Sequence, residues 1–213
     1  PGKRNAAARG RDCRQTAQAL TAMWSAPSLI VPPATSAVTL DALKEFVRVD
    51  VGTPYFDGQL AAFAEVATHH IEAMCGIRLV PQTVELSADD WDSLARLPIG
   101  PVTAITSIHY RDQTGAEQLL SPALYELAGS GLARAIRPSF GAQWPVALAA
   151  SGAIQVRLVA GYAALPGPLW AAVLYLAADL FAFRETAVTG AAAQAIPMSA
   201  TVEATLANYR IWL

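Results

Sequence analysis

The chain has 213 residues, of which 54% are hydrophobic and 15% are charged, and its formal net charge is −2. This length can bury a substantial core, and the low charged fraction suits a subunit that hides surface against neighbours. The two cysteines, Cys13 and Cys75, match no metal or redox spacing, so we expect no disulfide framework and a reducing cytoplasm.

Charge is distributed unevenly along the sequence. Residues 1–22 carry five basic side chains against one acidic, a charge of +4, whereas the remaining 191 residues carry ten basic and sixteen acidic, a charge of −6. We predict a flexible basic N-terminal arm over residues 1–27. The arm is interpreted as a tail, as sequence upstream of a natural start at Met23, or as a segment that contacts nucleic acid or an acidic neighbour. No signal peptide is evident.

The first half of the chain begins with an extended segment and two helices. Residues 28–33 (SLIVPP) are predicted to be extended, and Thr39 is a predicted N-cap of a short helix. A second helix is predicted from Asp57, as its cap, to Gly76, as its C-terminal stop. The expected buried stripe of this second helix consists of Leu60, Phe63, Ala64, Ala67, Ile71 and Met74.

The middle of the chain has the period of β-strands. Strands are predicted over residues 80–86, 102–110 and 153–160, with alternating apolar side chains. Two hairpins are predicted, one with a turn at 113–115 and one around Gly129 and Gly131. The strand at 102–110 is expected to carry Val102, Ala104, Thr106, Ile108 and Tyr110 on one face and Ile105 on the other.

The most apolar stretch, residues 166–186, predicts a helix that begins at two prolines. Its uncharged run is too short for a membrane span, because Asp179 interrupts it. A final helix is predicted after Ser199. The expected stripe of the apolar helix is Leu169, Val173, Leu176, Leu180 and Phe183, and that of the last helix is Val202, Leu206, Tyr209 and Trp212.

This order predicts an α+β fold, with helices at both ends forming a helical bundle and a central block of antiparallel β hairpins. We expect one domain over residues 28–213, helical at 28–76, β at 77–162 and helical again at 163–213.

The sequence holds no positive signal for catalysis, so we expect no enzyme and no cofactor. Phosphate-loop and nucleophile-elbow motifs are missing. Adjacent His69 and His70 point about 100° apart on a helix and do not suit one metal ion. The carboxylates Asp89, Asp90 and Asp92 lack the glycine and distal glutamate of a calcium loop, and we interpret them as a solvated turn before an inward-packed Trp91.

Two alternatives from other classes remain open at this point. A small enzyme or ligand-binding domain would have a pocket in the β block, containing His109 or the carboxylates at 89–92. A nucleic-acid-binding module would use the basic arm and bind DNA with steep salt dependence. The charge of −6 on the remaining residues argues against the second alternative.

Several strings of the sequence together resemble the head–tail connector (adaptor) proteins of tailed bacteriophages and gene transfer agents. They cover most of residues 32–213 and contain no catalytic motif. The strings are PPATSAVTLDALKEFVRVD, HHIEAMCGIRLVPQTVEL, LPIGPVTAITSIHYRDQTGAEQLL, the WP pair at 144–145, VRLVAGYAALPGPLWAAVLYLAADLF and LANYRIW.

The resemblance implies a structural subunit of a homo-oligomeric ring, usually of twelve copies, at the head–tail junction of a virion or phage-like particle assembled in the bacterial cytoplasm. Its implied partners are a portal protein, a stopper protein and transiting double-stranded DNA that is not read by sequence; no membrane is involved. The mildly acidic body suits a DNA conduit, because negative charge repels the phosphate backbone. The expected portal interface is Tyr209, Arg210, Trp212 and Leu213, and the expected ring interface is Trp170, Tyr175 and Phe181.

Overall fold

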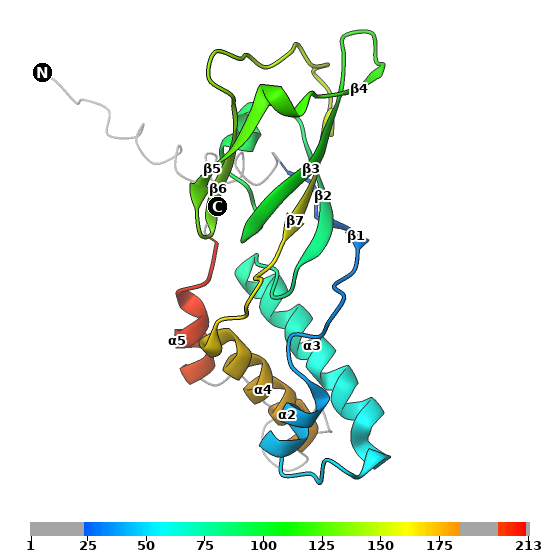
Figure 1. Cartoon of the computed structure of the whole chain (residues 1–213), viewed down its shortest axis with the longest axis vertical. Coiled ribbons are helices and arrows are strands. Elements are labelled where there is room, and N and C mark those ends of the chain that lie inside the picture. The colour runs from blue at the N-terminus through cyan, green and yellow to red at the C-terminus, as the bar shows by residue number, and fades with distance from the viewer. Residues whose placement is uncertain (1–23, 184–199, 212–213) are drawn as a thin grey trace, which may run out of the picture.

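The computed structural model describes residues 24–183 and 200–211. The molecule is elongated, with its helices gathered at one end and its strands at the other (Figure 1). Helices from both halves of the chain meet in one group, because α4 contacts α2, α3 and α5. The predicted α+β class with antiparallel strands is confirmed. The predicted bundle at both ends is not confirmed.

Local sequence signals explain where the helices begin and end. In α2 (Leu40–Phe46), the Thr39 side chain accepts a hydrogen bond from the Ala42 amide, as predicted for an N-cap. Helix α3 (Asp57–Cys75) ends at Gly76, whose φ of 69° suits a residue without a Cβ. Asp57 does not cap α3; it lies in the first turn. The other helices are α4 (Gly167–Ala182), α5 (Ala200–Ala207) and the short 3-10 turns η1 (Pro54–Phe56), η2 (Asp92–Ala95) and η3 (Pro122–Leu124).

The strands form two antiparallel sheets. The larger has the order β1-β2-β7-β3-β4, so the last strand of the chain lies at its centre. Among the described strands, β3–β4 and β5–β6 are the two hairpins, and they lie at the two predicted turns. The strands are β1 (Ser28–Val31), β2 (Gln82–Ala88), β3 (Val102–Arg111), β4 (Glu117–Leu119), β5 (Tyr125–Ser130), β6 (Ala133–Pro138) and β7 (Ile154–Ala160).

Strict alternation holds in β2 and β7 and fails in β3. Every second residue of β2 and β7 is buried. In β3 the pairing with β7 shifts at two places, and Ala104 and Thr106 are exposed while Val102 and Ile108 are buried. The prediction that these residues share one face along the whole strand is therefore wrong, because bulges change which side a residue faces.

Each end of the molecule has its own hydrophobic core. The helical core joins α2, α3, α4 and α5, and the sheet core lies between β2, β7, β3 and η2. The largest fully buried side chains divide between them: Leu43, Leu60, Ile71, Ile77 and Leu79 in the first, and Leu86, Leu94, Leu97, Ile99, Ile108, Ile136 and Ile154 in the second.

Buried polar contacts fix the junction between the two cores. Glu72 of α3 is 7% exposed, and its Oε1 accepts hydrogen bonds from the Leu79 amide at 2.8 Å and from Gln82 Nε2 at 3.1 Å. Gly161 follows β7 with a φ of 133°, and a Cβ there would lie 2.3 Å from the Val80 carbonyl oxygen. The return of the chain to the helices thus passes too close to the start of the sheet for any larger residue.

Two further sequence predictions have definite outcomes. The last helix ends at Ala207, so Tyr209 lies beyond it, whereas the prediction extended the helix further. The predicted apolar stripe of α4 is correct at Leu169 and Val173, but Phe183 lies beyond the helix and is 52% exposed. The Ser199 cap and Cys13 lie outside the described residues. Across the helices that the structure describes, none has the length and apolar character that crossing a membrane requires.

Candidate functional site

The segment that follows α5 lies against the end of α3 in its own subunit. The Ile211 amide donates a hydrogen bond to the Cys75 carbonyl oxygen at 2.9 Å, and Tyr209 is half-buried against the helical core. Arg210, between them, is exposed. Of the predicted portal interface, Arg210 is therefore at the surface, Tyr209 is partly used by its own subunit, and Trp212 and Leu213 lie outside the described residues.

Tyr162 packs in the helical core near Tyr209 and Cys75, where the C-terminal segment meets α3, and its pKa is raised. Burial, followed by the proximity of Tyr209 and Cys75, raises the pKa of Tyr162 from 10.0 to about 12. Burial likewise raises the pKa of the Cys75 thiol, although Arg210 opposes the shift. The contact of the C-terminal segment with α3 thus leaves measurable consequences for titration.

We expect alkaline pH to loosen this junction. Tyr162 stays protonated in the folded chain up to a pKa near 12, whereas an unfolded tyrosine ionises near 10. Its contribution to stability is therefore complete below pH 10 and is lost as the pH rises from 10 to 12, by about 1 kcal/mol after allowance for solvent contact. Urea unfolding at several pH values should show a smaller alkaline loss for Tyr162→Phe than for wild type. An equal loss in both would contradict this assignment.

Aromatic side chains form two edge-to-face clusters, one between α2 and α4 and one between η1 and α4. Phe46 and Tyr175 meet edge to face at 5.2 Å between ring centroids, and Phe56 meets Phe181 in the same way at 5.5 Å. Tyr55 packs edge to face on Phe56 at 4.7 Å and is 82% exposed. We call these five residues the aromatic ridge.

The predicted ring-interface residues divide between the ridge and another face of α4. Tyr175 and Phe181 belong to the ridge, Tyr175 being 51% exposed and Phe181 half-buried. Trp170 is 41% exposed but lies five residues before Tyr175, about 140° away around the helix. Edge-to-face packing holds the exposed ridge aromatics in fixed positions, as an interface anchor requires.

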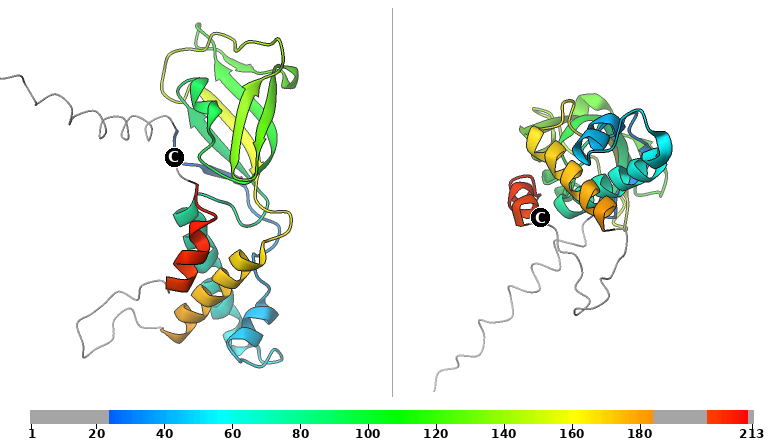
Figure 2. Two further views of the ribbon diagram at one scale, coloured as in Figure 1. Left: turned by 90° about the vertical axis from the view of Figure 1, so that its left-hand side faces the viewer. Right: turned by 90° about the horizontal axis from the view of Figure 1, so that it is seen from below.

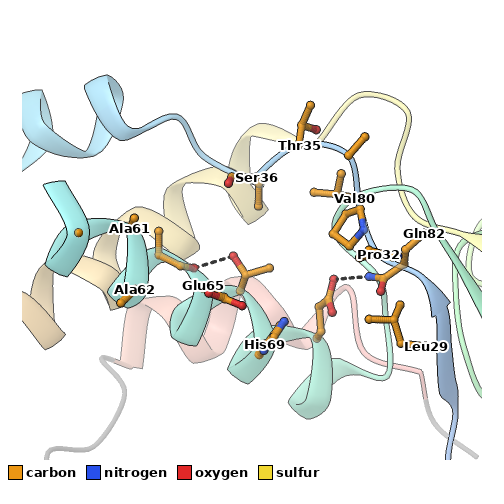
Figure 3. A pocket seen from close by; sticks show the side chains of 17 residues that line it. Leu29, Pro32, Thr35, Ser36, Ala61, Ala62, Glu65, His69, Val80 and Gln82 are labelled. Carbon is orange, nitrogen blue, oxygen red and sulfur yellow. Dashed lines mark hydrogen bonds between the residues drawn. The ribbon is translucent and has the colours of Figure 1, made fainter.

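A groove of about 630 Å³ lies beside α3, between this helix and the link from β1 to α2 (Figure 3). Small residues, Ala61 and Ala62, form one wall, and Glu65 and His69 of the same helix face the groove. The Glu72–Gln82 hydrogen bond closes one end. Figure 2 shows the same molecule from two further sides, with α3 beside the link from β1 to α2.

The residues weighed for chemistry in the sequence do not assemble a site. His69 and His70 are exposed on α3, and no cluster of three or more potential metal ligands occurs among the described residues. His109 Nδ1 lies 3.0 Å from Glu117 Oε1, beside a cavity of about 10 Å³, the space of roughly one water. The cavity beside His109, one of the two places that the ligand-binding alternative proposed, is therefore too small for a substrate.

The carboxylates at 89–92 stabilise loops, as predicted for a turn. Asp90 accepts hydrogen bonds from the Ser93 amide and hydroxyl, and Asp89 accepts from the Gly152 amide at 2.7 Å. Trp91 packs inward, stacked on Trp144 with ring centroids 4.7 Å apart. Both predictions, the turn and the inward tryptophan, are confirmed.

Comparison with known proteins adds the fold relationship. No protein-family model and no curated protein matches the chain. A chain in the neck of an empty gene transfer agent (GTA) particle, computed with C6 symmetry, superimposes with a TM-score of 0.71 at 23% identity, covering 89% of this chain and 97% of that one. A chain of the native GTA virion gives 0.68 at 22% identity, with the same coverage. A chain from the native neck computed with C12 symmetry gives 0.58 at 23% identity, covering 87% and 97%.

These similarities concern the whole fold, because almost the full length of each neck chain is matched. The identities are low, so they establish the shared fold. At that level the resemblance to the head–tail connector family inferred from the sequence is confirmed.

Proposed function

We propose that this protein is a structural, non-enzymatic component of the neck of a phage or phage-like particle. More specifically, it is a head–tail adaptor subunit that lies between the portal and the stopper protein. The observation that carries the proposal is the match over 89% of this chain and 97% of a GTA neck chain. The lack of a substrate-sized cavity beside His109 points away from the ligand-binding alternative.

The protein forms a closed ring of twelve copies under this proposal. Neck structures of similar chains were computed with C12 and C6 symmetry. A head-to-tail ring requires two different surfaces on each subunit. The aromatic ridge, with Tyr175 and Phe181, and the exposed Trp170 supply apolar surface, and the groove beside α3 supplies a concave surface.

The C-terminal segment is the portal-facing element. Arg210 is exposed, and the hydrogen bond from Ile211 to Cys75 holds the segment beside the end of α3. Tyr209, Arg210, Trp212 and Leu213 are the proposed contacts, since aromatic residues and arginine are common interface anchors. The connector domain spans residues 28–213, preceded by the basic arm.

The ring surrounds the path of double-stranded DNA at the head–tail junction. The sixteen acidic side chains after residue 22 outnumber the ten basic ones, which favours passage of DNA without tight binding. No base-reading element is needed for this role, and assembly takes place in the bacterial cytoplasm.

Truncation of the chain tests the adaptor role. We expect particles carrying a chain that ends after Pro197 to lose tail attachment, counted in electron micrographs as tailless heads. Because Val202 and Leu206 are buried in the subunit's own core, a second chain that ends after Tyr209 retains them and removes only residues 210–213. Normal tail attachment with both truncated chains would contradict the proposal.

A further inference from the structure

Four arginines line a second concave site, which includes residues of the C-terminal segment. A pocket of about 390 Å³ lies between η2, the β5–β6 hairpin and residues 210–211. Its floor is apolar and includes Leu97, Leu132 and Ile211. The arginines that line it are Arg96, Arg134, Arg137 and Arg210.

The concentration of positive charge here is opposite to the character of the body. Only ten basic residues follow position 22, and four of them line this one pocket. None of the described lining residues is acidic; Glu126 faces Arg137 across the hairpin but does not line the pocket. Because arginine stays charged at all physiological pH values, such a cluster favours a negatively charged occupant.

The fold fixes the backbone positions of Arg134 and Arg137 beside the pocket. The amide of Leu97, just after η2, donates a hydrogen bond to the carbonyl oxygen of Arg134 in β6. In the β5–β6 ladder, Arg134 pairs with Gly129 and Arg137 pairs with Glu126. Arg134 Nε is buried and has no hydrogen-bond partner within the part of the chain that is described. A buried donor without a partner is costly, which is consistent with a site that is completed by a bound acceptor.

The pocket is continuous with the proposed portal-facing segment, because Arg210 and Ile211 belong to both. We propose that the pocket receives an acidic segment of the portal protein, with its carboxylates on the arginines and an apolar side chain on the floor. This inference rests on the proposed adaptor function and adds the chemistry of the partner surface. The apolar floor and small concave shape fit a peptide segment better than the smooth phosphate backbone of a DNA duplex.

Binding of the full-length chain to the portal from the same particle tests this inference. The portal is immobilised and the dissociation constant is measured at several salt concentrations. At 0.1 M salt we expect Arg137→Gln to weaken binding about tenfold and Arg134→Gln with Arg137→Gln to weaken it about a hundredfold. Because the variants have fewer charged contacts, their binding should also depend less steeply on salt.

Arg111→Gln is the matched control, because this substitution removes the same charge as the pocket variants. Arg111 is exposed on β3 and does not line the pocket. This variant should bind like wild type. Arg137 is also exposed, so its single variant is expected to fold normally, which a thermal melt checks. Wild-type affinity in both pocket variants would overturn the inference.

Other occupants give different results in the same set of proteins. If the double variant binds portal normally but loses binding to a 20-base-pair duplex, the pocket takes DNA and the inference is overturned. If it loses only ring formation, measured by native mass spectrometry, the occupant is a second copy, which also overturns it. Wild-type protein that does not bind portal at all would contradict the adaptor function itself.

Discussion

Replacing Lys44 by alanine is expected to destabilise the folded chain by about 1–3 kcal/mol. Lys44 is 2% exposed, and its Nζ lies 2.5 Å from Asp57 Oδ1. The approach lacks hydrogen-bond direction, so charge holds this pair, while Nζ donates hydrogen bonds to the carbonyl oxygens of Val51 at 3.0 Å and Thr53 at 3.1 Å. Removing the lysine leaves a half-buried carboxylate and two carbonyl groups without their cation.

Denaturant titration of the single and double variants measures this effect. Lys44→Ala should lower the unfolding midpoint strongly, and Lys44→Met with Asp57→Asn should recover part of the loss because no unpaired charge remains. Glu45→Ala, an exposed neighbour on α2, is the control and should change stability by less than about 0.5 kcal/mol. A loss below about 1 kcal/mol for Lys44→Ala would show that the cation does not organise this loop.

The consequence of Lys44 for function follows from its position. It joins the C-terminal part of α2 to the loop before α3, and this region carries Phe46, Tyr55 and Phe56 of the aromatic ridge. The buried cation therefore holds the proposed ring-forming surface in shape.

Substituting Tyr175 by aspartate is expected to abolish ring formation while leaving the subunit folded. Tyr175 is 51% exposed and packs edge to face on Phe46, which is 40% exposed. A carboxylate at the centre of an apolar contact must be desolvated without a partner, which is costly at every interface of the ring. We expect at least a hundredfold lower ring fraction at the protein concentration where wild type assembles.

Leu119→Asp provides a matched control for this prediction. Leu119 is 64% exposed on the edge strand β4, at the opposite end of the molecule from the ridge. The Leu119→Asp substitution introduces the same charge at an exposed apolar position and should leave the ring intact. Rings that persist with Tyr175→Asp, seen by light scattering, would exclude the ridge as an interface.

Local signals in the sequence predicted much of the fold. The Thr39 cap, the Gly76 stop, both hairpins and the inward faces of β2 and β7 follow from residue types at fixed spacings, which require no knowledge of distant partners. The strand order could not be predicted in this way. The placement of β7 between β2 and β3 depends on pairing between residues 44 to 78 positions apart, and alternation alone does not specify a neighbour.

The buried polar residues were also beyond sequence analysis. Lys44 and Glu72 occur in ordinary amphipathic helices, and only the tertiary structure shows that they face carbonyl and amide groups of later segments. The end of α5 was mispredicted for a similar reason. The apolar spacing of Tyr209 favoured a longer helix, but the Ile211 amide pairs with Cys75 of α3.

The candidate surfaces were predicted in part. The predicted helix over residues 166–186 already separates Trp170 and Tyr175 around its axis, but only the tertiary structure shows that both are exposed. The arginine pocket joins residues from positions 96, 134, 137 and 210, whose spacing in the chain carries no motif. The family resemblance, in contrast, came from strings distributed over most of the chain, and the fold comparison supports it.

The most direct test of the adaptor account is the native mass of the purified chain, alone and mixed with the portal from the same particle. The account predicts a ring-sized species near twelve copies of the 22.4 kDa chain, or a stoichiometric complex that forms only with the portal. A monomer whose mass is unchanged by the portal would contradict it.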